Sequence, residues 1–202
     1  MPVCFHKRVI KTHPKEGEGQ LVRVPCGKCL PCRINHAMEW ASRCEVEAMY
    51  YEGRSCFVTL TVSPENMKFA SDGKPTLDKK VIQDFMKRLR ISIERKYSEH
   101  LDSFYAVGEY GSKRGRPHYH ALLFGFRPHD LEFYKPSYSG YPLYKSKFIQ
   151  DCWQQGLVFV GDGVNAASAG YCARYIQKKL KTSADSHFIK FTTANNRDIS
   201  AR

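Results

Sequence analysis

Two apolar runs separated by a short basic turn constrain the fold more than any other feature of the sequence. The runs are F-Y-A-V-G-E-Y, residues 104–110, and H-Y-H-A-L-L-F, residues 118–124, with S-K-R-G-R in the turn between them. Their aromatic and branched residues predict two antiparallel strands of one hairpin. Because successive side chains of a strand point to opposite faces, His118 and His120 share one face while Tyr119 points to the other.

The remaining segments alternate between helix and strand patterns. Apolar residues at helical spacing predict helices over residues 31–52, 77–97, about 145–155 and about 166–181. Either Thr76 or Asp78 can cap the second of these helices. Aromatic and β-branched runs predict strands over residues 55–64 and 157–160. Residues 1–30, 127–144 and 183–202 lack a clear period and are expected to be irregular. This order predicts an α+β domain with a central, mostly antiparallel β-sheet flanked by helices.

The charge of the chain indicates the class of its partner. The 202 residues include 32 lysines and arginines against 20 aspartates and glutamates, a net charge of +12. Such an excess attracts polyanions, chiefly nucleic acid, with an anionic membrane surface as the alternative. Hydrophobic residues at 42% and aromatic residues at 13% suffice for a core. No transmembrane run and no secretory signal are present, so we expect a soluble intracellular protein that does not bind membrane.

The two histidines of the hairpin form a candidate metal site. Side chains two apart on a strand lie about 7 Å apart at their roots and can converge on one cation. The hairpin places Glu109 or Tyr110 across from them, and of these only Glu109 is a ligand for a hard cation. Two imidazoles and a carboxylate suit Mg²⁺ or Mn²⁺ better than a closed zinc site. The alternative is that His118 and His120 are polar strand residues facing solvent.

A second candidate site is a helix that carries two tyrosines, within A-G-Y-C-A-R-Y-I-Q-K-K-L, residues 169–180. Tyr171 and Tyr175 are four apart and lie on one face, which Lys178 shares. A tyrosine hydroxyl, with a pKa of about 10, is a weak nucleophile at neutral pH. A divalent cation that polarises a phosphate, with a lysine nearby, makes its attack feasible. The alternative is an amphipathic helix with both tyrosines half in the core and a basic last turn.

Together these segments resemble the HUH endonucleases, in particular the rolling-circle replication initiators of microviruses, which are single-stranded DNA phages. F-V-T-L-T-V-S-P (57–64) resembles their first motif, G-R-P-H-Y-H-A-L-L-F-G (115–125) their metal-binding motif, and Y-C-A-R-Y-I-Q-K (171–178) their two-tyrosine motif. The stretch V-G-E-Y-G-S-K-R-G-R-P-H-Y-H also resembles circular-virus initiators, in which an acidic residue before the turn is a metal ligand. P-C-G-K-C-L-P-C-R is similar to the gokushovirus branch. The resemblance extends from Cys4 to about Lys179, and gokushovirus initiators usually continue beyond this helix.

The resemblance implies the palm-like HUH endonuclease fold, Glu109 as the third metal ligand, and Tyr171, Tyr175 and Lys178 as catalytic residues. It implies that one tyrosine attacks single-stranded origin DNA, leaving a 5′-phosphotyrosine and a free 3′-OH that primes a host DNA polymerase. The second tyrosine then cleaves the regenerated origin, and the DNA is religated. A host helicase is a further expected partner. No fused helicase is expected, because the sequence contains no G-x-x-x-x-G-K-[ST]. We expect a monomer in the cytoplasm of a bacterial host.

The eight cysteines include a tight cluster in C-G-K-C-L-P-C. Three thiols lie around one turn: Cys26, Cys29 and Cys32. Their spacing suits a tetrahedral, structural Zn²⁺ that orders the N-terminal extension, with three free thiols as the alternative. The fourth ligand is Cys4, Cys44 or His36, of which Cys4 is slightly favoured. Three further cysteines lie in apolar or helical patterns and are expected to be inert core thiols: Cys56, Cys152 and Cys172.

Two groups of residues are candidates for DNA contacts, and a third group of basic residues has a simpler explanation. Basic residues of the hairpin turn lie beside the metal site and are expected to bind phosphates: Lys113, Arg114 and Arg116. Basic residues of the long helix are expected to form a solvated face: Lys79, Lys80, Lys87, Arg88, Arg90, Arg95 and Lys96. Tyrosines of the segment 127–144 either stack on unpaired bases or pack within the loop: Tyr134, Tyr138, Tyr141 and Tyr144.

The expected organisation is a Cys-rich segment with its helix over residues 1–53, an HUH endonuclease domain over 54–182 and a tail over 183–202. The predicted function is a metal-dependent nickase and ligase that starts and terminates rolling-circle replication of a phage genome. Two alternatives stay open. One is an HUH transposase or relaxase, although the paired tyrosines argue against one-tyrosine transposases. The other is a non-catalytic, zinc-containing protein that binds single-stranded DNA.

Overall fold

The computed structural model describes residues 2–13, 17–111, 115–178 and 190–193, and for residues 175–178 and 190–193 it describes the backbone. Its centre is a seven-stranded sheet of order β11-β6-β7-β3-β10-β9-β8, with all neighbouring strands antiparallel. The strands are β3 (Ser55–Thr61), β6 (Ser103–Tyr110), β7 (Pro117–Phe124), β8 (Glu132–Pro136), β9 (Pro142–Lys145), β10 (Val158–Asp162) and β11 (Lys190–Thr193). Two small hairpins pair β1 (Arg8–Lys11) with β2 (Leu21–Val24), and β4 (Lys68–Phe69) with β5 (Pro75–Thr76).

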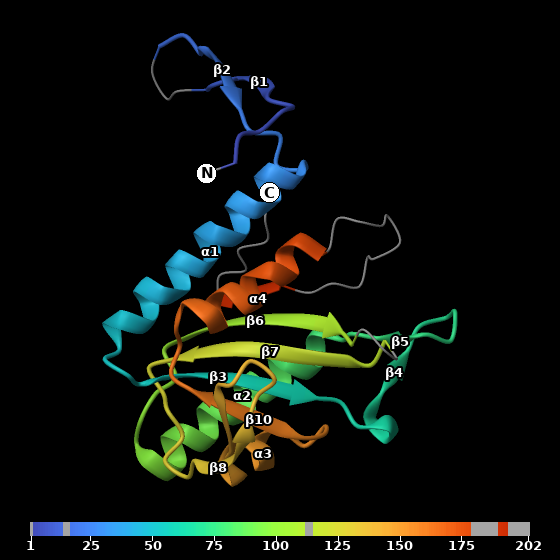
Figure 1. Ribbon diagram of the computed structural model, residues 1–202, viewed down its shortest axis with the longest axis vertical. Helices are drawn as coiled ribbons and strands as arrows, with labels where there is room; N and C mark the ends of the chain where they lie inside the picture. The colour runs from blue at the N-terminus through green and yellow to red at the C-terminus, as the bar shows by residue number, and fades with distance from the viewer. Residues whose placement is uncertain (1, 14–16, 112–114, 179–189, 194–202) are drawn as a thin grey trace.

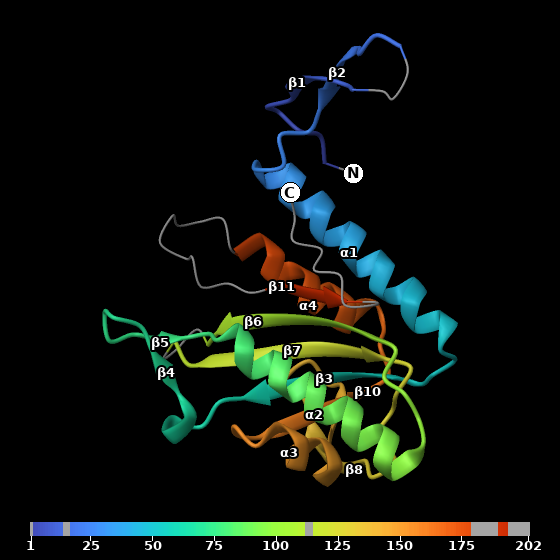
Figure 2. The ribbon, with the colours of Figure 1, turned by 180° about the vertical axis from the view of Figure 1, so that it is seen from behind.

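Helices cover both faces of the sheet. They are α1 (Leu30–Tyr50), α2 (Lys79–Tyr97), α3 (Lys147–Trp153) and α4 (Ala166–Lys178), with a 3₁₀ turn at Pro64–Asn66. The helices α1 and α4 lie on one face, and α2 and α3 lie on the other (Figures 1 and 2). The predicted α+β class, with a large antiparallel sheet flanked by helices, is confirmed. Among the described residues, no helix has the length and apolar character that crossing a membrane requires.

The alternation of side chains along the strands divides the core in two. On the α2/α3 face, Leu60 of β3 packs with Leu89 and Trp153, all fully buried. On the α1/α4 face, Leu122 of β7 packs with Cys172 of α4 in a smaller cluster. Both faces of the central strands are therefore covered by helices, which holds their register firmly because a one-residue slip would exchange the two faces.

The register of β6 and β7 fixes which polar side chains meet. Glu109 lies directly opposite His118, and Val107 lies opposite His120. On the other side of β7, Thr59 of β3 lies opposite His120. Of the two residues that the sequence offered as partners of the histidines, Glu109 shares their face, whereas Tyr110 lies opposite Pro117 on the other face.

Several elements differ from the prediction. Strands occur in three segments expected to be irregular: β1 and β2 within residues 1–30, β8 within 127–144 with β9 (Pro142–Lys145) at its end, and β11 within 183–202. Each has only four or five residues and gives a weak local signal. Each is paired with a neighbouring strand, which stabilises it beyond its own propensity.

The start of the long helix is also settled. Asp78 is the N-cap of α2, because its carboxylate accepts a hydrogen bond from the backbone N–H of Lys80 at 2.8 Å. The other candidate cap, Thr76, lies in β5.

The predicted strand over 55–64 ends at Thr61, and Pro64 opens the 3₁₀ turn. The last predicted helix runs to Lys178, and its final three predicted residues lie outside the described part of the chain.

Candidate active site and metal centres

Three ligand atoms meet at one end of the β6–β7 hairpin. Glu109 Oε2 lies 3.1 Å from His118 Nε2 and 3.4 Å from His120 Nε2, and all three ligand atoms lie within 4.8 Å of one another. Glu109 and His120 are buried, and His118 is half-buried. We call this cluster of Glu109, His118 and His120 the Glu/His site. The structure thus brings together the three residues that the sequence proposed as metal ligands.

The outer nitrogens of both imidazoles have partners, one from the end of the hairpin turn and one from β3. His118 Nδ1 lies 3.2 Å from the backbone carbonyl of Arg116, and His120 Nδ1 lies 3.1 Å from Thr59 Oγ1. Because a carbonyl can only accept, His118 Nδ1 donates to it, and His118 Nε2 is left to face Glu109 Oε2. A divalent cation between the two imidazoles and the carboxylate fits this arrangement.

Tyr171 of α4 packs against this site. Its ring meets the His120 ring edge to face, with centroids 5.0 Å apart, and meets Phe57 of β3 at 6.0 Å. Phe57 in turn stacks in parallel on His120 at 5.6 Å. The Arg174 guanidinium lies 5.7 Å from the Tyr171 ring centre. One of the two predicted nucleophiles therefore lies beside a predicted metal ligand that is fifty-one positions earlier in the chain.

The position of α4 follows from its start and its packing. The Asn165 side-chain carbonyl accepts hydrogen bonds from the backbone N–H groups of Ala167 and Ser168, both at 3.0 Å, which caps the helix. The helix then packs on β6, β7 and α1 through its small buried residues. Tyr175 and Lys178 occupy the fourth and seventh positions after Tyr171 in the same helix, and their side chains lie outside the described ones.

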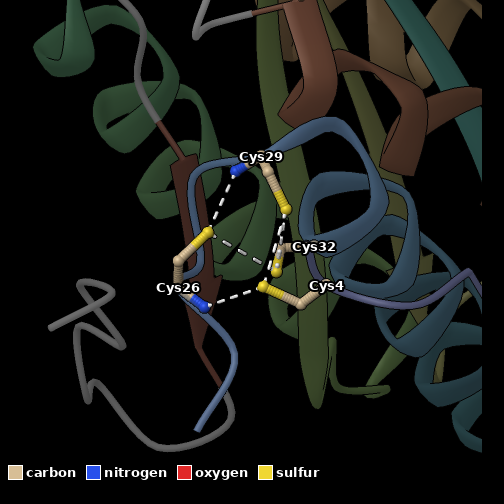
Figure 3. Close-up of side chains that lie close together, drawn as sticks. All are labelled: Cys4, Cys26, Cys29 and Cys32. Carbon is tan, nitrogen blue, oxygen red and sulfur yellow. Dashed lines mark hydrogen bonds between the residues drawn. The ribbon is translucent and has the colours of Figure 1, made fainter. Parts of the chain in front are cut away.

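Four thiols meet where the N-terminal segment reaches α1 (Figure 3). The Sγ atoms of Cys4, Cys26, Cys29 and Cys32 lie within 4.8 Å of one another, the closest pair being Cys29 and Cys32 at 3.4 Å. We call this cluster the Cys site. The fourth member is Cys4, as the sequence slightly favoured. Cys44 is instead buried against the sheet.

Backbone N–H groups donate to the thiols of the Cys site. The N–H of Cys26 points to Cys4 Sγ, and those of Lys28 and Cys29 point to Cys26 Sγ, at 3.3 to 3.4 Å. Gly27, at a φ of +74°, lets the chain turn tightly enough for this. These bonds lower the pKa of the Cys26 thiol to about 6, whereas burial raises the pKa of Cys32 to about 12. Thiolates that accept backbone hydrogen bonds are ready ligands for a soft cation.

The three cysteines expected to be core thiols are buried, as predicted. Cys56, Cys152 and Cys172 are all buried. Burial raises the pKa of Cys56 to about 12 and that of Cys172 well above its ordinary value. These thiols stay protonated at neutral pH and pack as small apolar groups.

The basic residues of the hairpin turn and of the long helix are placed differently from one another. Arg116 borders the Glu/His site through its carbonyl, while Lys113 and Arg114 lie outside the described residues. The long helix is only partly a solvated face. Arg88 donates to the carbonyls of Cys152 and Trp153, and Arg90 donates to the carbonyl of Leu101, because a guanidinium can satisfy loop carbonyls that would otherwise be buried unpaired.

Residues near the site that sequence reasoning missed are Phe57 and Thr59. Both lie on the same face of β3 as Thr61, with buried Val58 and Leu60 on the other face. The polar residues at alternate positions in F-V-T-L-T were a usable signal, since threonine in an apolar strand at a spacing of two marks one polar face.

The chain is similar to known replication-associated proteins. The model of a family described as replication-associated protein ORF2/G2P matches residues 55–180. The replication-associated protein ORF2 of Spiroplasma virus 4 is 39% identical over 158 residues, covering 78% of this chain and 48% of that protein. The replication-associated protein VP4 of Bdellovibrio phage phiMH2K is 38% identical over 164 residues, covering 80% and 50%. The replication-associated protein ORF4 of Chlamydia phage 1 is 32% identical over 166 residues, covering 80% and 40%.

The chain spans about half the length of the curated relatives that it matches. No solved structure matches it.

Proposed function

The chain belongs to the replication-associated protein ORF2/G2P family, and from this premise we propose that it is an HUH-type endonuclease that nicks and rejoins single-stranded DNA at a phage replication origin. The observation that carries the proposal is the contact of Tyr171 with His120 at a ring distance of 5.0 Å. This contact brings a tyrosine beside the two imidazoles and the carboxylate of the Glu/His site. In that position its hydroxyl can attack a phosphate that is held at the site.

The proposed step is a transfer of the phosphodiester to a tyrosine of α4. Mg²⁺ or Mn²⁺ at the Glu/His site would polarise the phosphate and stabilise its developing charge. The tyrosine oxygen forms a bond to phosphorus, the bond from phosphorus to the 3′ oxygen breaks, and the phenolic proton passes to that oxygen. The products are a 5′-phosphotyrosine and a 3′-OH. Thr59 and the Arg116 carbonyl keep the two imidazoles oriented during the step.

Tyr171 and Tyr175 are both proposed as nucleophiles, with Lys178 assisting. Their positions four apart in α4 put them on one side of the helix, about 6 Å apart at their roots. One tyrosine therefore opens the origin and the other cleaves it again when it is regenerated, so that the 3′-OH attacks the first phosphotyrosine and closes the circle. No nucleotide hydrolysis is needed, because each transfer conserves the phosphoester.

The cellular setting is part of the proposal. The 3′-OH is extended by a host DNA polymerase with a host helicase, in the cytoplasm of the infected bacterium, and the protein acts as a monomer. The proposed endonuclease unit is residues 54–182. The net charge of +12 supports a polyanionic partner.

We assign Zn²⁺ to the Cys site. Four thiols within 4.8 Å leave no ligand position for a substrate, which is the pattern of a structural zinc site. The metal would fasten β1 and β2 to the first turn of α1.

The test is a search for a covalent adduct. The full chain is incubated with Mn²⁺ and labelled single-stranded oligonucleotides that tile the genome encoding it, then separated on a denaturing gel. An adduct is expected on the segment holding the origin, in wild type and in Tyr138→Phe, and is expected to vanish in the double variant Tyr171→Phe, Tyr175→Phe. Binding without any adduct would favour the non-catalytic DNA-binding alternative, and an adduct that survives in the double variant would refute the proposed nucleophiles.

A further inference from the structure

The sheet face that carries the Glu/His site continues beyond the helices that cover it. On this face α4 packs on β6 and β7. The next strands present partly exposed side chains there: Phe57, Thr59 and Thr61 of β3, and Phe159 of β10. The opposite faces of the same two strands are buried in the larger core, as Val58 and Val160 show. A strip of accessible sheet surface therefore borders the Glu/His site.

The strand register connects this strip to His120. Thr59 lies opposite His120 and bonds to it at 3.1 Å, and Phe159 lies opposite Thr59 on the next strand. Adjacent strands are about 4.8 Å apart, so Phe159 lies about 10 Å from His120 across the sheet. A DNA strand whose scissile phosphate lies at the Glu/His site can reach Phe159 within a few nucleotides.

Tyr134 extends this row from the β8–β9 hairpin. The pairing of β8 with β9 shifts between Phe133 and Lys135, so Tyr134 occupies a bulge. Its ring stacks on Phe159, with centroids 5.6 Å apart and an angle of 26° between the rings, and stays 41% exposed. Lys145 Nζ lies 4.2 Å from the centre of the Tyr134 ring.

The other tyrosines of this segment are placed differently. Tyr144 packs against the larger core and contacts Phe133. Tyr138 is fully exposed at the tip of the hairpin, and Tyr141 is more than half exposed. The sequence left stacking on bases and packing in the loop as equal possibilities for all four. Tyr134 is the one that the structure holds in a fixed orientation with an accessible ring beside a lysine.

A groove of about 990 Å³ reaches this stack from the α2/α3 side of the sheet, between the β8–β9 hairpin, α2 and α3. Its walls include Tyr134, Phe159 and four basic residues: Arg95, Lys96, Lys145 and Lys147. Three acidic residues also line it: Asp130, Glu132 and Asp151. Within the groove Asp151 pairs with Lys147, Asp130 accepts from Ser146 Oγ and the N–H of Phe148, and Glu132 lies opposite Lys145. Four basic residues against three acidic ones leave the lining with a formal excess of one positive charge.

We propose that Tyr134, Lys145 and Phe159 form a nucleotide subsite, the Tyr134 subsite, that holds single-stranded DNA on one side of the scissile phosphate. This rests on the proposed function only for the location of that phosphate. Phe159 supports the Tyr134 ring, and the ammonium groups of Lys145 and Lys135 lie over that ring, at 4.2 and 5.1 Å from its centre. On binding, an unpaired base stacks on the ring in place of the Lys145 ammonium, which pairs with the adjoining phosphate. Aromatic rings beside cations are what single-strand-binding surfaces use, because every base has a stacking face and every nucleotide a charge.

The test compares binding and cleavage in matched variants. Affinity for a fluorescein-labelled, mixed-sequence 30-nucleotide DNA strand is measured by anisotropy for wild type, Tyr134→Ala, Tyr134→Trp and the control Tyr138→Ala. Loss of one base stack predicts a roughly 5- to 150-fold weaker Kd for Tyr134→Ala, with wild-type affinity in Tyr134→Trp and Tyr138→Ala. Equal affinity of Tyr134→Ala and Tyr138→Ala would overturn the subsite. If Tyr134→Ala lowers the melting temperature, Tyr134→Leu replaces it, since leucine fills the space above Phe159 without an aromatic face.

Lys145 gives an independent readout. Lys145→Ala is expected to reduce the slope of log K against log salt by about 0.7, the value for one phosphate on a single strand. The control Lys87→Ala, on an exposed part of α2 away from the groove, is expected to leave the slope unchanged. An unchanged slope in Lys145→Ala would remove the phosphate contact from the proposal.

Photocrosslinking separates the subsite from the nuclease proposal. With 5-iodouracil in the strand, crosslinks are expected at Tyr134 or Phe159, and crosslinks confined to other elements contradict the subsite. If wild type crosslinks there but forms no covalent adduct on any oligonucleotide, the nuclease proposal fails while the subsite stands. If adducts form but Tyr134→Ala binds as wild type does, the subsite alone fails.

Discussion

The two candidate metal centres differ in almost every physical respect. The Glu/His site offers three ligands, two from β7 and one from β6, in the middle of a sheet covered by helices. The Cys site offers four ligands, from the N-terminal segment and the first turn of α1. The strands of that segment are largely exposed, and every residue of β1 is exposed. Three ligands leave coordination positions for a substrate, whereas four thiolates close the sphere. The sheet is held by apolar clusters on both of its faces, whereas β1 and β2 have little apolar burial other than the Cys site to hold them.

The comparison therefore separates chemistry from folding. Disrupting the Glu/His site should abolish activity and leave the structure intact. Disrupting the Cys site should release the N-terminal extension and leave the catalytic face in place. The predictions below test this separation, beginning with the largest effect.

Removing a ligand of the Glu/His site should have the greatest consequence for activity. For His120→Ala we expect a loss of about 10³-fold in the rate of adduct formation, because the developing charge on the phosphate loses its main electrostatic support. The control His100→Ala changes the same residue type at an exposed position. A His120→Ala variant that cleaves at the wild-type rate, measured by single-turnover kinetics, would remove the site from the mechanism.

Removing a ligand of the Cys site should act on structure. In Cys26→Ser we expect zinc content, measured by mass spectrometry of the native protein, to fall from one ion per chain toward zero. We also expect hydrogen exchange of β1 and β2 to rise sharply while β6 and β7 stay protected, and adduct formation to persist. Lys28→Ala is the control, since it changes the same turn without removing a ligand. Loss of protection across the central sheet would contradict the separation of the two centres.

The orientation of His120 by Thr59 should have an intermediate effect. Thr59→Val removes the hydroxyl 3.1 Å from His120 Nδ1 while keeping the shape of the side chain. We expect the affinity for Mn²⁺ to be 10- to 100-fold weaker, seen as a higher Mn²⁺ concentration for half-maximal adduct formation. Thr59→Ser restores the hydroxyl and should restore the wild-type value. If Thr59→Val and Thr59→Ser behave alike, the hydroxyl does not position the ligand.

The smallest effect concerns the reactivity of the thiols without metal. The lowered pKa of Cys26, about 6 against an ordinary 9.0, means that the folded extension holds a thiolate between these pH values while the unfolded chain holds a thiol. Its contribution to stability is present above pH 9 and is lost as the pH falls through 6. At pH 7 the metal-free protein should be alkylated by iodoacetamide at Cys26 about 4-fold faster than an ordinary thiol, because higher thiolate content outweighs lower nucleophilicity.

Peptide mapping by mass spectrometry checks this order. Cys56 and Cys172 should remain unmodified, since burial keeps them protonated and inaccessible. Adding zinc should protect Cys26. Uniform alkylation of Cys26 and Cys56 would show that the two environments do not differ as described.

Much of the Glu/His site was predictable because it depends on strand periodicity alone. The spacing of two puts His118 and His120 on one face, and the short turn places Glu109 across from them. For Thr59 and Phe57 the alternation in F-V-T-L-T indicated one polar face, but it could not show that this face adjoins His120, because the pairing of β3 with β7 is a tertiary fact. The same limit applies to β11, which pairs with β6 from a distant part of the chain.

The Cys site shows the opposite balance. The tight spacing of Cys26, Cys29 and Cys32 predicted a cluster, but Cys4 was only one of three options for the fourth member. The choice depends on how the chain folds back after β1 and β2, two strands too short to be recognised. The stacking of Tyr134 on Phe159 likewise depends on a bulge between β8 and β9, in a segment expected to be irregular.

The most direct test of the central claim is to identify the residue that carries the DNA. After reaction with Mn²⁺ and origin DNA, the adduct is digested with nuclease and protease, and the peptide that retains a nucleotide is sequenced by mass spectrometry. The account predicts a 5′-nucleotide on Tyr171 or Tyr175, formed only with the divalent cation and absent in His120→Ala. A nucleotide attached to any other residue, or an adduct that forms equally well in His120→Ala, would contradict it.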